Sequence, residues 1–170
     1  MNKIKVSHEV PLCLLEKSLS FNNYDYCLPH LMDESEEYKN FFLKAKEAGR
    51  YIMMDNSLHE LGKPYDEDRL FYWLDKLQPQ EFFVPDYWED KDASIESAER
   101  WILFQEKYPD TTFIAVVQAK YINEASVCYE EYKKLGYKKI AFSYGASWYN
   151  TLIPHPNKNL GKALGRIGLI

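Results

Sequence analysis

Five short apolar segments, each followed by a polar residue, recur at nearly even spacing along the 170-residue chain. The polar residues that follow them are His30, Asp55, Asp86, Gln118 and Ser143, which are 25, 31, 32 and 25 residues apart. Segments with helical periodicity lie between them, so strands alternate with helices at the length of one strand-helix unit. This spacing predicts an α/β fold with a parallel sheet and right-handed crossover connections.

The expected strands are apolar runs flanked by turn residues, at 50–55 (RYIMMD), 81–86 (EFFVPD), 111–118 (TTFIAVVQ) and 138–145 (KKIAFSYG). The segment 24–32 (YDYCLPHLM) is expected to supply a first strand that ends near His30.

The expected helices each have apolar residues at helical spacing on one face. The first covers 33–49, with Asp33 and Glu36 in capping-box spacing and Gly49 at its end. The second is capped by Asp66 and stops at Pro79, the third covers 94–107, and the fourth runs from Asn123 to Gly136. The side chains expected to face the core are Tyr38, Phe41, Phe42 and Ala45; Leu70, Trp73, Leu74 and Leu77; Ile95, Ala98, Ile102 and Gln105; and Cys128, Tyr132 and Leu135.

The length of the chain decides how these units are interpreted. A closed eight-unit barrel needs about 250 residues, whereas this chain holds about five units before the apolar run 160–170 (LGKALGRIGLI). We therefore expect one domain, residues 1–170, with a parallel (β/α) TIM-barrel type of fold that is incomplete. A complete open sheet of five strands is the alternative.

Composition excludes several classes of protein. The longest apolar runs are far shorter than the ~20 residues of a membrane span, and the first residues lack the pattern of a signal peptide, so we expect a cytoplasmic protein without membrane contact. Three cysteines without a C-x-x-C pair, and His59-Glu60 without a second histidine at helical spacing, predict no metal site and no cofactor. The formal charge of −5 argues against simple coating of nucleic acid, and the basic residues of the tail, Lys158, Lys162 and Arg166, are interpreted as solvated surface.

Candidate chemistry lies at the ends of the strands, because ligands of parallel α/β folds bind beyond the carboxyl ends of the strands. Asp55 and Asp86 are each preceded by apolar residues, where burial perturbs a carboxyl pKa, and Gln118 can both donate and accept hydrogen bonds as the reading of a purine edge requires. The alternatives are that the two aspartates cap helices and that Gln118 is a satisfied residue at the rim. Aromatic residues in the same loops would suit stacking on a nucleobase; they are Tyr87, Trp88, Tyr144, Trp148 and Tyr149.

Four of these segments, DNSLHELG, VPDYWED, AVVQAK and KKLGYKKIAFSYG, resemble in order and spacing the tRNA-guanine transglycosylase superfamily, especially its DNA 7-deazaguanine transglycosylase and phage-type branch. The resemblance extends from Tyr24 to Tyr149. It implies a TIM barrel that exchanges guanine in DNA or tRNA for a 7-deazaguanine base through a covalent aspartyl intermediate.

The resemblance also implies roles for single residues. Asp55 looks like the aspartate that lies over the base and acts in acid-base steps, although Asn-Ser follows it instead of the usual Ser-Gly-Gly. Asp86 resembles the carboxylate that accepts hydrogen bonds from the Watson-Crick face of the base, and Gln118 the amide that contacts the purine carbonyl. Ser143, Tyr144 and Gly145 occupy the place of a glycine-rich turn whose backbone amides help to hold the base.

Two parts of the family pattern are missing. The nucleophilic aspartate of the family lies on a later strand, but no aspartate follows Tyr149, and the cysteine-histidine zinc site is absent. A nucleophile is required for the covalent mechanism, so three possibilities remain: a transglycosylase completed by missing strands or by a partner chain, a non-catalytic nucleobase- or nucleic-acid-binding protein, and an unrelated (β/α) hydrolase that uses Asp55 and Asp86. The exposed terminal strands of half a barrel predict a homo-oligomer or poor solubility.

Overall fold

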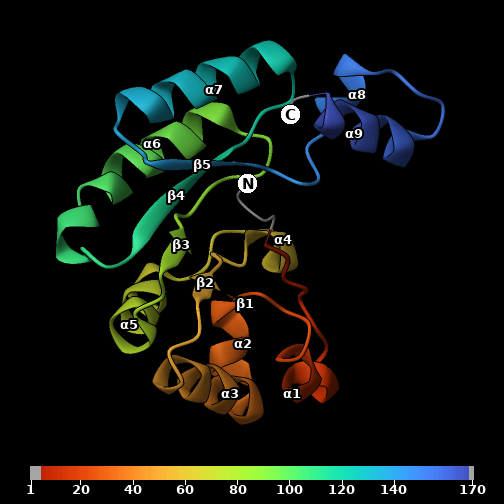
Figure 1. The fold of residues 1–170 in the computed structure, drawn as a ribbon. Helices are drawn as coiled ribbons and strands as arrows, with labels where there is room; N and C mark the ends of the chain where they lie inside the picture. The colour runs from red at the N-terminus through yellow and green to blue at the C-terminus, as the bar shows by residue number, and fades with distance from the viewer. Residues whose placement is uncertain (1–4, 169–170) are drawn as a thin grey trace. The chain divides into compact units, whose positions relative to one another are not determined.

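The computed structural model describes residues 5–168. Its strands form one sheet in the order β1-β2-β3-β4-β5 (Figure 1). The strands are β1 (Asp25–Cys27), β2 (Ile52–Met54), β3 (Glu81–Phe83), β4 (Thr112–Val117) and β5 (Lys139–Phe142). The described pairings of β1 with β2, β2 with β3 and β4 with β5 are all parallel. The predicted α/β class, parallel pairing and alternation of strands with helices are confirmed.

The chain divides into two compact units. The first consists of residues 5–83 together with Gln105–Phe113, and the second of Val84–Phe104 together with residues 114–168. The first unit contains β1 to β3, the first two residues of β4, and the helices η1 (Leu12–Leu14), α1 (Leu15–Ser18), α2 (Pro29–Glu34), α3 (Glu36–Glu47), α4 (Leu58–Leu61), α5 (Glu67–Leu77) and η2 (Gln105–Lys107). The second contains the rest of β4, β5, and the helices α6 (Lys91–Ile102), α7 (Ile122–Lys134), α8 (Tyr149–Leu152) and α9 (Lys158–Ile167).

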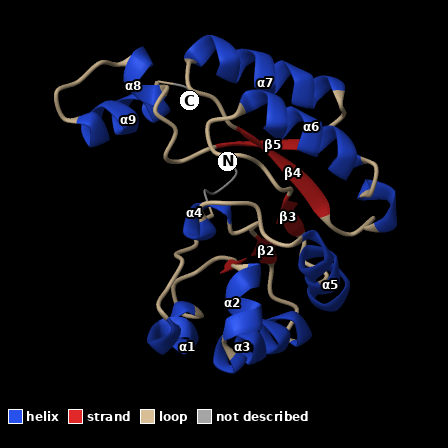
Figure 2. Cartoon of the chain, turned by 180° about the vertical axis from the view of Figure 1, so that it is seen from behind, coloured by secondary structure: helices blue, strands red, loops and turns tan. Residues whose placement is uncertain are grey.

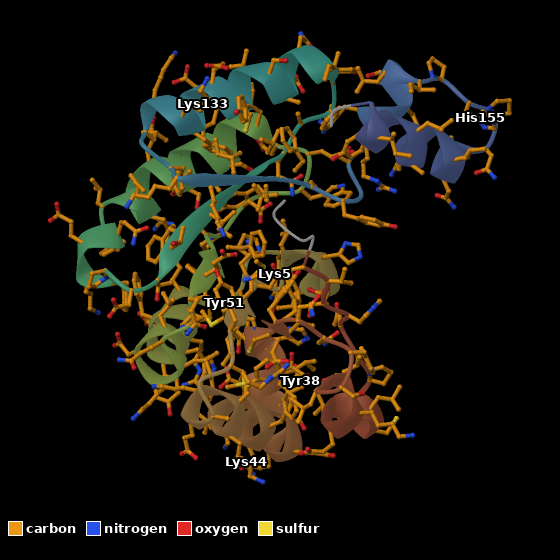
Figure 3. All side chains as sticks on the ribbon, viewed as in Figure 1. Lys5, Tyr38, Lys44, Tyr51, Lys133 and His155 are labelled. Atoms are coloured by element: carbon orange, nitrogen blue, oxygen red, sulfur yellow. The ribbon has the colours of Figure 1, made fainter. Side chains whose placement is uncertain are left out.

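The core of the first unit is built from the predicted faces of α3 and α5. All eight side chains expected to face the core from these two helices are buried, and the hydroxyl of Tyr38 accepts a hydrogen bond from the backbone N–H of Leu28 at 2.9 Å. Lys44, by contrast, points into solvent from the other face of α3 (Figure 3). Asp66 caps α5 as predicted, accepting from the backbone N–H of Arg69 at 2.9 Å.

In the second unit, α6 and α7 lie side by side (Figure 2). Cys128 and Tyr132 of α7 are buried as predicted, and the hydroxyl of Tyr132 donates to the carbonyl of Val116 in β4 at 3.0 Å. The hydroxyl of Tyr137, which follows α7, donates to the carbonyl of Ala98 in α6 at 2.8 Å. These two hydroxyls tie α7 to the sheet and its following loop to α6.

Several expected boundaries differ from the structure. The first strand ends at Cys27, and His30 lies in α2, because Pro29 begins that helix at a position where its missing N–H costs nothing. Ser35, rather than Asp33, caps α3, and Asp33 instead pairs with Arg69. The helix expected at 94–107 is α6, which begins at Lys91 after an Asp90 cap.

The ends of the chain also differ from the expectation. The helix expected to be capped by Asn123 begins at Ile122 after Tyr121. The apolar run 160–170 lies largely in α9, which begins at Lys158 after Asn157, whose side chain caps the helix by accepting from the backbone N–H of Leu160 at 3.2 Å. Within residues 5–168, no helix is long and apolar enough to cross a bilayer, and the three cysteines are free thiols.

Candidate functional site

Asp55 follows β2 in the first unit, and its position is set by the alternation of the strand. Residue burial alternates in β1 and β2, and Tyr26 of β1 is in register with Met53 of β2. Tyr26, Met53 and Asp55 therefore lie on one face of the strands, opposite the fully buried face that carries Cys27 and Met54. The backbone N–H of Asp55 donates to the carbonyl of Cys27 at 2.8 Å, which continues the β1/β2 ladder.

The carboxyl group of Asp55 has a strongly perturbed pKa. Burial raises this pKa from its ordinary value to about 6, and the negative charge of Glu60 raises it as well. Hydrogen bonds from the Tyr26 hydroxyl and the backbone N–H of Ser57, the latter at 3.1 Å, act in the opposite direction. A carboxyl group with a pKa near 6 can both give and take a proton close to neutral pH, which is what acid-base catalysis requires.

The residues after Asp55 hold a second polar contact. Nδ1 of His30 lies 2.8 Å from Oγ of Ser57, and both side chains are buried. Ser57 has a φ of 62°, a left-handed conformation that glycine adopts without cost but that side-chain-bearing residues rarely adopt. This contact orients the imidazole next to the turn that carries Asp55.

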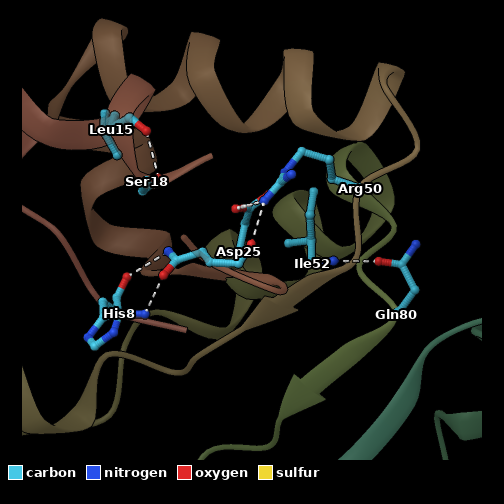
Figure 4. Close-up of polar contacts among 8 residues, drawn as sticks. His8, Leu15, Ser18, Asp25, Arg50, Ile52 and Gln80 are labelled. Atoms are coloured by element: carbon cyan, nitrogen blue, oxygen red, sulfur yellow. Dashed lines mark hydrogen bonds and ion pairs between the residues drawn. The ribbon is translucent and has the colours of Figure 1, made fainter. Parts of the chain in front are cut away.

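The opposite ends of β1 and β2 carry a structural network (Figure 4). Arg50 donates to both carboxylate oxygens of the buried Asp25, at 2.5 and 2.9 Å, and the side chain of Asn22 bonds the backbone N–H and carbonyl of His8 at 2.8 and 3.0 Å. A cavity of about 10 Å³ lies here, room for about one water molecule, lined by His8, Glu9, Val10, Leu15, Ser18, Asn22, Asp25, Tyr26, Tyr38, Phe41 and Phe42. This end of the strands therefore carries a network of charged and polar contacts that holds β1 and β2 to the segments before them.

In the second unit, the side chains of Asp86 and Gln118 are in direct contact. Nε2 of Gln118 donates to Oδ2 of Asp86 at 2.6 Å. Only 4% of Asp86 and 3% of Gln118 is exposed, so this hydrogen bond lies in a largely dehydrated environment. Asp86 follows β3 and Gln118 follows β4, as the strand-end argument predicts for residues that meet at one edge of a sheet.

The amide of Gln118 has a single orientation in this contact. Its Oε1 accepts from the backbone N–H of Glu89 at 3.2 Å, while its Nε2 is bound to Asp86. The second hydrogen of Nε2 has no partner among residues 5–168, so Gln118 has one donor left for a ligand. Behind it, the thiol of Cys128 is buried and its pKa is raised by that burial, which makes it an unreactive packing group.

The loop after β5 contains the three other candidate residues. Ser143 is buried and its backbone N–H donates to the carbonyl of Val117 at 3.4 Å, whereas 78% of Tyr144 is exposed. The backbone N–H groups of Tyr144 and Gly145 have no acceptor within the described residues, so both remain available to a ligand. A Cβ on Gly145 would lie 2.6 Å from Cη2 of Trp88, so a larger residue here would require the Trp88 ring to shift.

Two cations of α9 hold this loop. Lys162 donates to the carbonyl of Gly145, and Arg166 donates to the carbonyl of Tyr144 at 2.7 Å with its guanidinium 4.2 Å from the centre of the Tyr144 ring. Both residues lie partly exposed at the surface, as predicted, but their charged groups also bind carbonyls of the loop at the strand end, which the sequence interpretation missed. Their spacing of four residues, which places both on one face of a helix, is the sequence signal that could have indicated a shared partner.

The structure thus places the candidates in two groups. Asp55 lies in the first unit with Tyr26, while Asp86, Gln118, Ser143, Tyr144 and Gly145 lie in the second. The sequence interpretation missed Tyr26, which hydrogen-bonds Asp55, and Glu89, which bonds Gln118 and Ser147. The residues from 5 to 168 contain no group of three or more histidine, cysteine, aspartate or glutamate side chains that could hold a metal ion.

Comparison with known proteins adds no assignment. No protein-family model matches the sequence, and no curated protein is significantly similar to it.

Proposed function

We propose that this protein binds guanine or a 7-deazaguanine base and acts as a transglycosylase-like protein on DNA or tRNA. The observation that carries the proposal is the buried pair of Asp86 and Gln118. The carboxyl group of Asp86 accepts hydrogen bonds, and beside it Nε2 of Gln118 has a second hydrogen to donate, while Oε1 of Gln118 is directed at Glu89. Side by side, these groups complement an edge with N–H donors beside a carbonyl, such as the edge of guanine, which carries the N2 amino group and O6.

Adenine is a poor match for the same pair. It presents an amino group where guanine has its carbonyl, so the remaining donor of Gln118 would meet another donor. A binding site built for one pattern of donors and acceptors discriminates strongly against ligands that leave its buried polar groups unpaired.

The order of the strands supports a barrel-type fold for this function. Doubly wound sheets reverse their strand order at a switch point, as in 3-2-1-4-5-6. Here the order runs from β1 to β5 without reversal, which is the order of consecutive strands in a (β/α) barrel. We therefore propose that the five strands are part of a TIM-barrel type of sheet.

Within the first unit, Asp55 is the proposed acid-base residue. Its pKa of about 6 suits a group that gives and takes protons near neutral pH. The resemblance of DNSLHELG to the transglycosylase motif gives the same assignment.

Binding without base exchange is the second candidate function. The observation that favours it is the Asp86–Gln118 pair itself, which supplies hydrogen-bonding groups for a base but no bond-breaking step. Labelled guanine incorporation into DNA and tRNA distinguishes the two functions, since a protein that only binds gives none.

Calorimetric titration with guanine, 7-deazaguanine and adenine tests the proposal. We expect both guanine-type bases to bind and adenine to bind more weakly. Asp86→Ala removes a hydrogen bond to a charged group, worth about 1.5–3 kcal/mol, so guanine affinity should fall roughly 10- to 100-fold. Asp110→Ala, a change of an exposed aspartate, is the matched control and should leave affinity unchanged. Absence of guanine binding by the folded wild-type protein would exclude the proposed function.

A further inference from the structure

Glu89 connects three loops in the second unit, and each connection is a hydrogen bond. It lies in the loop after β3, its backbone N–H donates to Gln118 after β4, and its carboxylate reaches Ser147 after β5. Oε1 of Glu89 accepts from both the backbone N–H of Ser147, at 2.8 Å, and its Oγ, at 2.5 Å.

The backbone of Glu89 is in an unfavourable conformation. Its φ is 50°, in the left-handed region, which residues with side chains rarely adopt and keep only where their surroundings hold them. The bonds from Ser147 to the carboxylate supply that constraint. The strained backbone in turn directs the N–H of Glu89 at Oε1 of Gln118.

We propose that Glu89 is a positioning residue that, through its bond to Ser147, holds the Gln118 amide as a hydrogen-bond donor to the ligand. This inference rests on the proposed function, because the ligand that selects for such a donor is a 6-oxopurine. With Oε1 directed at the N–H of Glu89, Gln118 turns Nε2 rather than its oxygen to the ligand, and Nε2 cannot accept a hydrogen bond from a 6-amino group. Glu89 thereby contributes to the preference for guanine over 2,6-diaminopurine without touching either base.

Two substitutions of Glu89 separate positioning from a general structural role. Glu89→Ala removes the acceptor for Ser147, so the backbone should relax and release the Gln118 amide. Glu89→Gln keeps an oxygen that accepts the same two hydrogen bonds and should restore the arrangement. Glu96→Gln, at an exposed position of α6, is the control for the change of charge.

The first measurement uses the unliganded protein and needs no base. In NMR spectra the side-chain NH₂ protons of Gln118 should exchange slowly with solvent in the wild type, in Glu89→Gln and in Glu96→Gln, and at least tenfold faster in Glu89→Ala. Equal exchange rates in all four folded proteins would overturn the positioning role, whether or not the protein binds guanine.

The second measurement is the ratio of the dissociation constants for 2,6-diaminopurine and guanine. We expect Glu89→Ala to lower this ratio several-fold and Glu89→Gln to restore it. An unchanged ratio in Glu89→Ala would contradict the inference, provided that the wild type binds guanine. If the wild type binds neither base, the proposed function fails, and the exchange rates alone decide the role of Glu89.

Discussion

At the scale of single residues, the pKa of Asp55 makes stability depend on pH. Burial holds this pKa at about 6 in the folded protein, against about 3.9 for an exposed aspartate. Between these values the folded state binds a proton that the unfolded chain has released, so the free energy of unfolding falls as pH rises from about 4 to about 6. At about 1.36 kcal/mol per pKa unit, the full effect is about 3 kcal/mol.

Asp55→Asn should remove this dependence, because the amide cannot ionise. We expect the variant to gain about 2 kcal/mol relative to the wild type when the pH of urea denaturation is raised from about 4.5 to about 7.5. Asp110→Asn, at an exposed position, should show no such gain. A constant difference in stability between Asp55→Asn and the wild type would mean that Asp55 ionises normally.

Other single residues show what sequence could and could not predict about the site. The strand-end rule identified Asp86 and Gln118, because a polar residue after an apolar run in a parallel fold falls at the ligand-binding edge. The rule could not identify Glu89, because its role depends on a left-handed φ and on a contact with Ser147, 58 residues away in the sequence. Tyr26 was missed because the sequence does not show which strand tyrosine has its hydroxyl next to a carboxyl group.

At the scale of helices and strands, apolar periodicity succeeded wherever the buried face is purely apolar, as in α3 and α5. In α6 it succeeded for Ala98, which is buried, but Ile95 and Ile102, which were expected to face the core, are only half-buried. Ser94 and Ser97 are buried instead, because their hydroxyls bond the backbone of Tyr87 and Pro85. A hydroxyl that satisfies a backbone carbonyl can replace an apolar side chain in a core, and a hydrophobic pattern cannot detect it.

The ends of α5 and α7 offer a matched pair of tests at this scale. Gln78 follows α5 with a φ of 48°, and Gly136 lies just beyond the end of α7 with a φ of 89°. Left-handed backbone disfavours side-chain-bearing residues by roughly 1–2 kcal/mol, and glycine is the usual residue at this position.

Gln78→Gly should therefore raise the free energy of unfolding by about 0.5–1 kcal/mol, since part of the relief is offset by the greater freedom of glycine in the unfolded chain. Gly136→Ala should lower it by about 1 kcal/mol. Chemical denaturation of the two variants measures both changes, and a loss of stability in Gln78→Gly would show that its exposed side chain makes a stabilising contact.

At the scale of the whole molecule, the last strand leaves an edge of the sheet unpaired within the described residues. β5 pairs with β4 and with no other described strand. The N–H of Ser143 points to β4, so the alternation of the backbone directs the N–H of Phe142 to the open side. The side chain of Phe142 is 42% exposed, although it stacks on Tyr129 of α7.

An unpaired edge beside an exposed aromatic side chain favours pairing with another chain. We expect reversible self-association, visible as a rise in weight-average mass by sedimentation over about a hundredfold range of protein concentration. Phe142→Lys should weaken it, because a charged side chain at an edge opposes pairing. Leu103→Lys is the control, because Leu103 is also apolar and 77% exposed but lies beyond the end of α6. This substitution should not weaken self-association. A monomer at every concentration, or an equal effect of both substitutions, would mean that the edge of β5 does not mediate association.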